Sequence, residues 1–401
     1  MHCLKKSVNS LMKSLVYNLI MKKNIAVMFG GISAEHEVSV ITGLQVLEKI
    51  DYAKFEVYAV YLNKDGLFYY YPLLTHRSLF QKIKPILCSF GRDKNGAYIR
   101  EDNWRGKKHR IDGAYLAFHG GNGEDGSVQG MMEVLGIAHT SADHEGSVVA
   151  MNKNLMKQVL REKQIPCVKS TGIFAEQFRN DKERVIKEIL EGVGLPVIIK
   201  PAHLGSSIGI NIAKDEAALV ANLSAAALVD NELLVEKLLE DFTEYNVSVR
   251  KFRGKIECSE IERPKKQDEI LSFADKYERE GGKKQTATQG GMAGLARELP
   301  AKISEELRRK VISLAMRVFE ECRLGGTARI DMLYENATGE LYVNEINPIP
   351  GSVAFYLWEA SGIQFQEQIT QSIERAFEAK DEREAYRLEY ETNIVEKFVN
   401  Q

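Results

Sequence analysis

The segment TARIDMLYENATGELYVNEIN, residues 327–347, contains the pattern that decides the fold of this chain. Apolar and polar residues alternate on both sides of a central NATG turn, which predicts two half-buried strands joined as a hairpin. If the strands pair, four polar side chains project from one face: Arg329, Asp331, Glu345 and Asn347. Carboxylate and amide oxygens are ligands that Mg²⁺ takes together with substrate phosphates, so this face is a candidate magnesium site. A solvated acidic face would show the same alternation, and the hairpin alone does not separate the two interpretations.

The composition narrows the class of protein. The chain has 401 residues, of which 44% are hydrophobic and 27% charged, and this length suggests two or three domains of an ordinary globular enzyme. A formal net charge of −2 argues against a general nucleic-acid binder and predicts no attraction to a membrane surface. The five cysteines are scattered, without zinc spacing or a close pair. We therefore expect a cytoplasmic enzyme that binds neither nucleic acid nor membrane.

Residues 1–20 differ from the rest of the chain, because they are basic and interrupted by polar residues. They lack the apolar core of a signal peptide. We expect a poorly ordered N-terminal extension ahead of Met21, with a short amphipathic targeting helix as the alternative.

The next hundred residues are typical of a doubly wound α/β domain. Strands are expected at 24–29, 55–61 and 113–118, a helix at 39–49, and irregular chain at 64–110. Ligands bind at the carboxyl ends of such strands, so Glu35, His36 and Glu37 are candidate contacts, although they could simply cap the helix. The glycine-rich loop 119–130 is a second candidate, with a plain surface loop as its alternative.

The middle of the chain has a phosphate-binding pattern. A helix expected at 151–162 carries Lys153 and Lys157, and a strand at 195–201 delivers Lys200 to a glycine/serine loop, 202–210. An ammonium group beside loop amides suits an anion. The order differs from a Walker A loop, whose lysine follows its glycines. A lysine that only solvates the strand end is the alternative.

The last part before the hairpin predicts strands at 234–239, 245–251 and 255–261 and a helix at 303–322. Between them, residues 264–299 are polar and glycine-containing. A segment of this length in an enzyme is expected to be either disordered or an active-site lid.

Five motifs then identify a family by resemblance. The most specific is HGGNGEDGSVQG at 119–130, and the others are GGISAEHEVS at 30–39, KP…GSSIG at 200–209, DKY at 275–277, and RID…NEIN at 329–347. Over roughly residues 23–376 the chain resembles the D-alanine–D-alanine ligases of the ATP-grasp superfamily. The resemblance implies a mixed α/β and α+β fold, with an N-terminal Rossmann-like open sheet followed by a two-lobed ATP-grasp domain. The implied units are 1–20, 21–145, 146–240, 241–380 and a tail at 381–401.

The resemblance also implies the reaction. ATP would phosphorylate one D-alanine, and the amine of a second would attack the acyl phosphate to give D-alanyl-D-alanine for peptidoglycan precursors. ATP is then a substrate, two Mg²⁺ or Mn²⁺ ions are cofactors, and the enzyme is expected to be a homodimer. Because both steps build negative charge, catalysis would rest on positioning and electrostatic stabilisation.

Site residues are implied by the same resemblance. It implies that Arg329 stabilises the tetrahedral intermediate and the transferring phosphoryl group, and that Glu35 anchors the ammonium of the first D-alanine. The implied metal ligands are Asp331, Glu345 and Asn347. The implied ATP-binding residues are Lys153, Lys200, Ser207, Glu236, Lys237, Leu239 and Glu244.

Two further implications concern the amino-acid substrates. Ser206 would link to Tyr277 across a closed lid, and these two residues join Glu35 and Arg329 in the implied catalytic set. Relatives that make D-alanyl-D-lactate usually lack a tyrosine at the position of Tyr277, so an amine acceptor is favoured. Lys276 would face the acceptor carboxylate. The implied substrate-binding residues are His119, Lys276, Gly351, Ser352 and Tyr356.

Departures from the family pattern gather on the acceptor side. The family's serine five residues beyond the Pro-Gly glycine is Tyr356 here; its phenol would have to donate the hydrogen bond, or Ser352 would have to substitute. The family's Thr-Gly-Ser turn is Thr-Ser-Ala at 140–142. The alternatives are therefore an ATP-grasp ligase for another amino-acid pair, or a non-catalytic nucleotide-binding module, which would be expected to have lost a metal ligand or Arg329.

Overall fold

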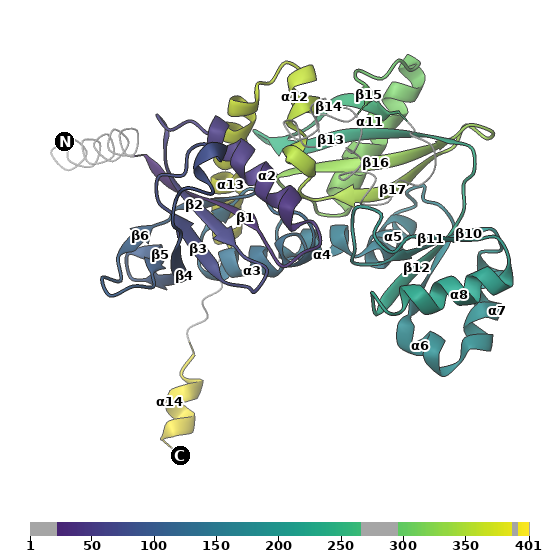
Figure 1. The fold of residues 1–401 in the computed structure, drawn as a ribbon, viewed down its shortest axis with the longest axis horizontal. Coiled ribbons are helices and arrows are strands. Elements are labelled where there is room, and N and C mark those ends of the chain that lie inside the picture. Colours follow the sequence, from purple (N-terminus) through teal and green to yellow (C-terminus); the bar gives the residue numbers. More distant parts are fainter. Residues whose placement is uncertain (1–21, 266–295, 387–391, 401) are drawn as a thin grey trace.

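A computed structural model of the chain describes residues 22–265, 296–386 and 392–400. Within these residues the strands form three sheets of eight, four and five strands. Figure 1 shows the eight-stranded sheet at the left, the four-stranded sheet at the lower right and the five-stranded sheet at the upper right. The mixed α/β and α+β class expected from the sequence is confirmed. The predicted extension at 1–20 and most of the predicted lid lie outside the described residues.

The eight-stranded sheet has the order β6-β5-β4-β3-β2-β1-β7-β8. Its centre, β2-β1-β7-β8, is parallel, and β3 to β6 extend it as an antiparallel meander. Its strands are β1 (Lys23–Gly30), β2 (Phe55–Leu62), β3 (Phe68–Tyr71), β4 (Ile86–Asp93), β5 (Gly96–Glu101), β6 (Lys108–Arg110), β7 (Gly113–Leu116) and β8 (Ala138–His139).

The helices around this sheet come from both ends of the chain. Phe365, Ile369 and Ile373 belong to the same hydrophobic core as β1 and β7, so a C-terminal helix completes the N-terminal unit. This burial of apolar surface ties the two ends of the sequence together. The elements here are α2 (His36–Lys49), η1 (Arg77–Leu79), η2 (Gly121–Gly123), α3 (Ser127–Val134) and α13 (Phe365–Glu384).

Two expectations for this region were wrong. Residues 64–110 are not irregular but contain four strands, and the longest of them, β4, runs to Asp93. The chain reverses just after it, where Gly96 has a φ of 108°, which glycine adopts without strain. Likewise, the glycine-rich motif is only a loop up to Gly126, because α3 begins at Ser127 and buries Gln129.

The four-stranded sheet has the order β11-β10-β12-β9, and all its neighbours are antiparallel. Three helices cover it, and together they enclose a separate hydrophobic core. Its elements are β9 (Ser170–Phe174), α6 (Ala175–Asn180), α7 (Lys182–Gly192), β10 (Val197–Pro201), β11 (Asn211–Ala213), α8 (Glu216–Ala226) and β12 (Glu232–Lys237).

The five-stranded sheet has the order β15-β14-β13-β16-β17 and is antiparallel. The predicted hairpin is its β16–β17 pair. The predicted helix at 151–162 starts instead at Lys153, because Asn152 breaks it from the helix before and caps its first turn. The elements are α4 (His144–Met151), α5 (Lys153–Glu162), β13 (Phe242–Phe252), β14 (Lys255–Pro264), β15 (Arg297–Glu298), α11 (Glu305–Glu321), β16 (Thr327–Glu335) and β17 (Leu341–Asn347).

The remaining C-terminal elements are η4 (Gly351–Ala354), α12 (Phe355–Ala360) and α14 (Ile394–Val399). In Figure 1, α14 extends away from the three sheets. The proposed domain limits stay a prediction, although α13 runs through residue 380. Among the residues that the structure describes, no helix is both long and apolar enough to cross a membrane.

Candidate active site

The hairpin carries its polar residues in the register that the alternation predicts. Arg329 pairs with Asn347, and Asp331 pairs with Glu345, so all four lie on one face of β16 and β17. Arg329 donates from Nε to Asp331 Oδ1 at 2.6 Å and from Nη2 to Oδ2 at 2.7 Å. The Nδ2 of Asn347 donates to Asp331 Oδ2 at 3.0 Å. The two-pronged ion pair fixes the guanidinium in one orientation.

The electrostatics of this face favour a cation. Burial raises the pKa of Asp331, Arg329 opposes the shift, and the charges of Glu345 and Glu262 add to it. A divalent cation would relieve this repulsion. No three His, Cys, Asp or Glu side chains gather into a metal cage anywhere in the described ranges. The donor set is instead two carboxylates and an amide, the partial set that Mg²⁺ completes with phosphates and water.

Two lysines approach this face, Lys153 from the start of α5 and Lys200 from β10 of the four-stranded sheet. Lys153 Nζ lies 3.9 Å from Glu345 Oε1 and donates to the carbonyl of Leu204 at 2.6 Å. Lys200 Nζ donates to Asn344 Oδ1 at 3.0 Å, which joins β10 to β17. Both lysines are buried. The structure therefore places two ammonium groups at the junction of the four- and five-stranded sheets, beside the acidic hairpin.

Glu236 holds the ammonium group of Lys200, together with that of a third lysine, Lys157. Its Oε2 lies 2.6 Å from Lys200 Nζ, and its Oε1 lies 2.6 Å from the Nζ of Lys157, which also donates to the carbonyl of Val343 at 3.0 Å. Burial opposes ionisation of Glu236, but the two lysines outweigh it and lower the pKa of the carboxyl. The side chain of Lys157 is completely buried. Its position one helical turn after Lys153 on α5 was the sequence signal for this role.

Three more of the predicted ATP-binding residues lie on or beside β12 and β13. Lys237 Nζ donates to the carbonyl of Leu195 at 2.5 Å, so its side chain is directed to the loop before β10. Leu239 comes after β12 and is partly exposed, and Glu244, on β13, pairs with Leu333 of β16. Their contact with adenosine stays a prediction.

Glu35 lies where three loops converge. Ser206 donates a hydrogen bond to its carboxylate. A Cβ on Gly120 would lie 2.6 Å from Glu35 Oε2, and a Cβ on Gly205 would lie 2.7 Å from the same atom. Only glycine permits this approach. Ser206 and Ser207 both have left-handed backbone, with φ of 50° and 61°, so the serine loop is held in an unusual conformation.

His119 is a buried neutral imidazole. Its Nδ1 lies 3.0 Å from the carbonyl of Ile349, an acceptor, so Nδ1 carries the proton and Nε2 accepts from Thr42 Oγ1 at 2.7 Å. Burial lowers the pKa of His119 to about 4; the Ile349 carbonyl opposes this shift and the charge of Arg329 adds to it. The N–H of Ser352 donates to Thr42 Oγ1 at 3.3 Å. His119 thus ties α2 to the segment after β17.

Glu124 is a functional candidate that the sequence reasoning did not select. Its carboxyl accepts from the N–H of Gly120 and, at 3.0 Å, from the N–H of Ile349. Burial raises the pKa of Glu124 to about 8, the charge of Glu35 adds to this, and the two N–H donors oppose it. The available signal was its place inside the HGGNGEDG motif.

Tyr356, predicted to lie on the acceptor side, belongs to a buried cluster. Its hydroxyl donates to Glu262 Oε1 at 3.2 Å, and Arg297 Nη1 donates to Glu262 Oε2 at 2.9 Å. The guanidinium of Arg297 lies 4.0 Å from the centre of the Tyr356 ring. Burial raises the pKa of Tyr356 to about 12. The phenol donates to Glu262, and its contact with an acceptor amino acid stays a prediction. Glu262 and Arg297 are residues that the sequence reasoning missed.

Gly351 and Ser352 precede this cluster in a left-handed turn. Ser352, Val353 and Ala354 have φ of 51°, 47° and 50°. Three consecutive non-glycine residues in this region are uncommon, which marks the turn as a site that the surrounding structure holds in place. Lys276 and Tyr277, predicted for the lid, lie outside the described residues.

These features define an ATP-grasp protein: an open α/β sheet precedes two antiparallel sheets, and a lysine from the four-stranded sheet and one from α5 meet the acidic hairpin of the five-stranded sheet. The family described as D-ala D-ala ligase N-terminus matches residues 24–142, and D-ala D-ala ligase C-terminus matches residues 159–374. A D-alanine–D-alanine ligase of Thermosipho africanus is 35% identical over 376 residues, covering 92% of this chain and 98% of the relative.

Solved structures agree on the fold. The D-alanine-D-alanine ligase from Coxiella burnetii has a TM-score of 0.75 at 23% identity, covering 91% of this chain and 96% of its own. The VanG D-Ala:D-Ser ligase from Enterococcus faecalis has a TM-score of 0.73 at 24% identity, covering 89% of this chain and 100% of its own. The chain belongs to the D-alanine–D-alanine ligase family.

Proposed function

We propose that this protein is an ATP-dependent ligase that joins two D-alanines for peptidoglycan precursors. The observation that carries the proposal is the approach of Lys153 to Glu345 at 3.9 Å, which puts a phosphate-binding cation beside a candidate metal ligand. The relatives named D-alanine–D-alanine ligase support the choice of substrate.

The reaction has two balanced steps. A carboxylate oxygen of the first D-alanine attacks the γ-phosphorus of ATP and ADP leaves. The amine of the second D-alanine then attacks the acyl carbon, phosphate leaves, and the nitrogen loses a proton. Because an acyl phosphate hydrolyses in water, the site has to exclude solvent.

The residues of this chain supply charge and orientation. Glu35, held by Ser206 between two glycine loops, would receive the ammonium of the first D-alanine. Lys153 and Lys200 would neutralise phosphate oxygens. Arg329, fixed by Asp331, would face the negative charge of the tetrahedral intermediate. Two Mg²⁺ or Mn²⁺ ions held by Asp331, Glu345 and Asn347 would supply further positive charge.

Phosphate release in the presence of ATP and a panel of D- and L-amino acids tests this proposal. We expect release that depends on D-alanine. Release that ignores D-alanine and responds to another amino acid would overturn the substrate assignment. The panel should contain D-serine and D-lactate, since the departure at Tyr356 lies on the acceptor side and a fold relative is named as a D-Ala:D-Ser ligase.

We further propose that the enzyme is a cytoplasmic homodimer, as the family resemblance implies. Light scattering coupled to size-exclusion chromatography measures the mass, which should be twice the 45.2 kDa of the chain. A monomer mass would reject the dimer.

A further inference from the structure

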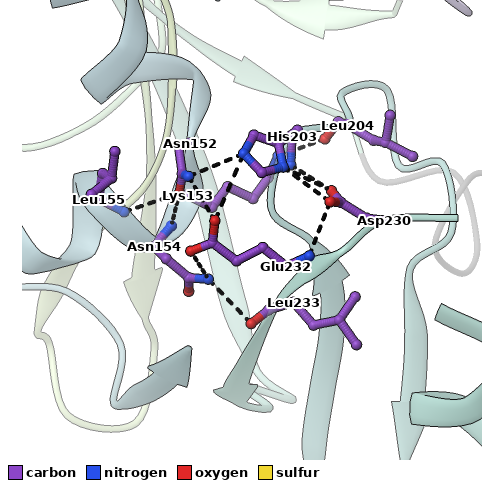
Figure 2. Close-up of polar contacts among 9 residues, drawn as sticks. All are labelled: Asn152, Lys153, Asn154, Leu155, His203, Leu204, Asp230, Glu232 and Leu233. Carbon is purple, nitrogen blue, oxygen red and sulfur yellow. Dashed lines mark hydrogen bonds and ion pairs between the residues drawn. The ribbon is translucent and has the colours of Figure 1, made fainter. Parts of the chain in front are cut away.

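A polar network joins three segments on the ATP side of the site, and Figure 2 shows His203 at its centre. His203, in the loop after β10, has Nδ1 at 3.0 Å from Asp230 Oδ1 and Nε2 at 3.1 Å from Asn152 Nδ2. Its backbone N–H donates to Asp230 Oδ2 at 2.8 Å. Glu232 Oε2 also accepts from Asn152 Nδ2, at 3.0 Å. The loop, the start of α5 and the start of β12 are therefore connected.

The orientation of Asn152 determines the tautomer of His203. The Oδ1 of Asn152 accepts from the backbone N–H groups of Asn154 at 2.9 Å and Leu155 at 3.1 Å, as the N-cap of α5. The NH₂ of Asn152 therefore points toward His203, and an amide NH₂ only donates. Nε2 of His203 has to accept, so its proton is on Nδ1, which donates to Asp230. This geometry belongs to a neutral imidazole.

The loop after β10 accepts hydrogen bonds from both the backbone and the side chain of Lys153. The backbone N–H of Lys153 donates to the carbonyl of Ala202 at 3.1 Å. The side-chain Nζ of Lys153 donates to the carbonyl of Leu204 at 2.6 Å. His203 lies between these two carbonyls in the sequence. Its side chain therefore sets the part of the loop on which Lys153 rests.

We propose that His203 is a positioning residue for ATP: by tying the loop after β10 to the N-cap of α5, it fixes the ammonium of Lys153 against the phosphates. The inference deepens the proposed function and rests on it, because it concerns the same ATP site. Loss of the imidazole would leave the charge of Lys153 in place but not its position, and positioning governs phosphate binding and transfer.

The network is linked to pH through three charged neighbours of the imidazole: Asp230, Glu232 and Lys153. The hydrogen bond to Asp230 raises the pKa of His203; burial and the charge of Lys153 oppose this, and Glu232 adds to it. Protonation would put a hydrogen on Nε2 that faces the NH₂ of Asn152. The neutral form is thus the one that holds the cap, and nucleotide binding should weaken as the pH falls through the raised pKa.

Three variants separate the contact of His203 with Asn152 from its contact with Asp230. His203→Gln keeps an acceptor that can reach Asn152, His203→Asn keeps a donor for Asp230, and His203→Ala removes both. Calorimetric binding of ADP with Mg²⁺ needs no amino-acid substrate, so it tests His203 even if the substrate proposal fails. We expect His203→Ala to weaken binding about tenfold, the scale of one lost hydrogen bond, and to raise the KM for ATP more than the KM for D-alanine. His203→Gln should restore most of the binding and remove its dependence on pH.

His76→Ala is the matched control. His76 is another histidine beside a carboxylate, with Nε2 at 3.5 Å from Glu48, but it is exposed and lies at the start of η1, beside the N-terminal sheet. The His76→Ala variant should bind ADP like the wild type.

If folded His203→Ala also binds ADP like the wild type, the proposal is overturned. Equal weakening in His203→Ala and His203→Gln, with the pH dependence retained in His203→Gln, would overturn the tautomer assignment. If His203→Ala does not fold, the wild-type pH profile and the Gln variant decide.

Discussion

Lys200 and Glu236 form a buried ion pair, with the ammonium 2.6 Å from the carboxylate. The same carboxylate binds Lys157 at 2.6 Å. One negative charge therefore compensates two positive charges, which α5 and β10 bring to the proposed ATP site. Because these charges are buried, removing one partner leaves the other unpaired, which costs more free energy than breaking an ion pair on the surface.

Replacing Glu236 with alanine should lower the free energy of unfolding by about 3–5 kcal/mol, because Lys157 and Lys200 would be left as uncompensated buried charges. Urea denaturation measures the change. Lys187→Ala is the control, since its pair with Glu191 is exposed and 3.9 Å long. That variant should change stability by less than about 0.5 kcal/mol. A Glu236→Ala protein as stable as the control would show that the buried pair has no structural role.

Replacing Glu345 with alanine should abolish turnover, because the variant loses a candidate metal ligand on the hairpin face. The fold should remain largely intact, since Glu345 is only partly buried at the sheet junction. Phosphate release and the melting temperature, measured on the same sample, check the two halves of this prediction. Turnover like that of the wild type would remove Glu345 from the metal site. Chelation of divalent cations should stop the wild-type reaction in the same way.

Glu124 should make the stability of the protein depend on pH. Burial raises its pKa to about 8 in the native state, whereas an unfolded glutamate has a pKa of about 4.3. Between these values the native state holds a proton that the unfolded chain releases. The contribution of Glu124 is therefore fully present below the unfolded value, and it decreases by about 1.4 kcal/mol per pH unit as the pH rises toward 8.

Glu124→Gln isolates this contribution from other titrating groups. The variant should be less stable at acid pH, because an amide cannot accept from both the Gly120 and the Ile349 N–H groups. Its free energy of unfolding should nevertheless fall less steeply between about pH 5 and 8 than that of the wild type. Parallel curves from chemical denaturation would mean that Glu124 is ionised in the native protein.

Tyr356 should affect the acceptor amino acid more than ATP. Tyr356→Phe removes the hydrogen bond to Glu262 but keeps the ring beneath Arg297, so we expect a loss of about 1–2 kcal/mol in stability. If the phenol helps to bind the acceptor, the KM for the second D-alanine rises and the KM for ATP does not. Steady-state kinetics with both substrates varied measures this. A change confined to ATP would place Tyr356 outside the acceptor pocket.

Local patterns in the sequence were sufficient for some elements and not for others. The hairpin was predictable because the register of paired strands is set by alternation and the length of the turn. The strands within 64–110 were not, because their pairing depends on an edge supplied by β2. The assignment of α13 to the N-terminal core was equally hidden, since its partners lie more than 200 residues earlier.

The sequence alone determined the family and the polar face of the hairpin, because these depend on neighbouring residues and on motifs. Only the tertiary structure decided the ion-pair partners, hydrogen bonds and protonation of the polar side chains. The buried pair of Glu236 with two lysines, the bond from Tyr356 to Glu262 and the tautomer of His203 each depend on residues that are distant in the chain. Burial and charge at such contacts come from packing, which a local pattern does not encode.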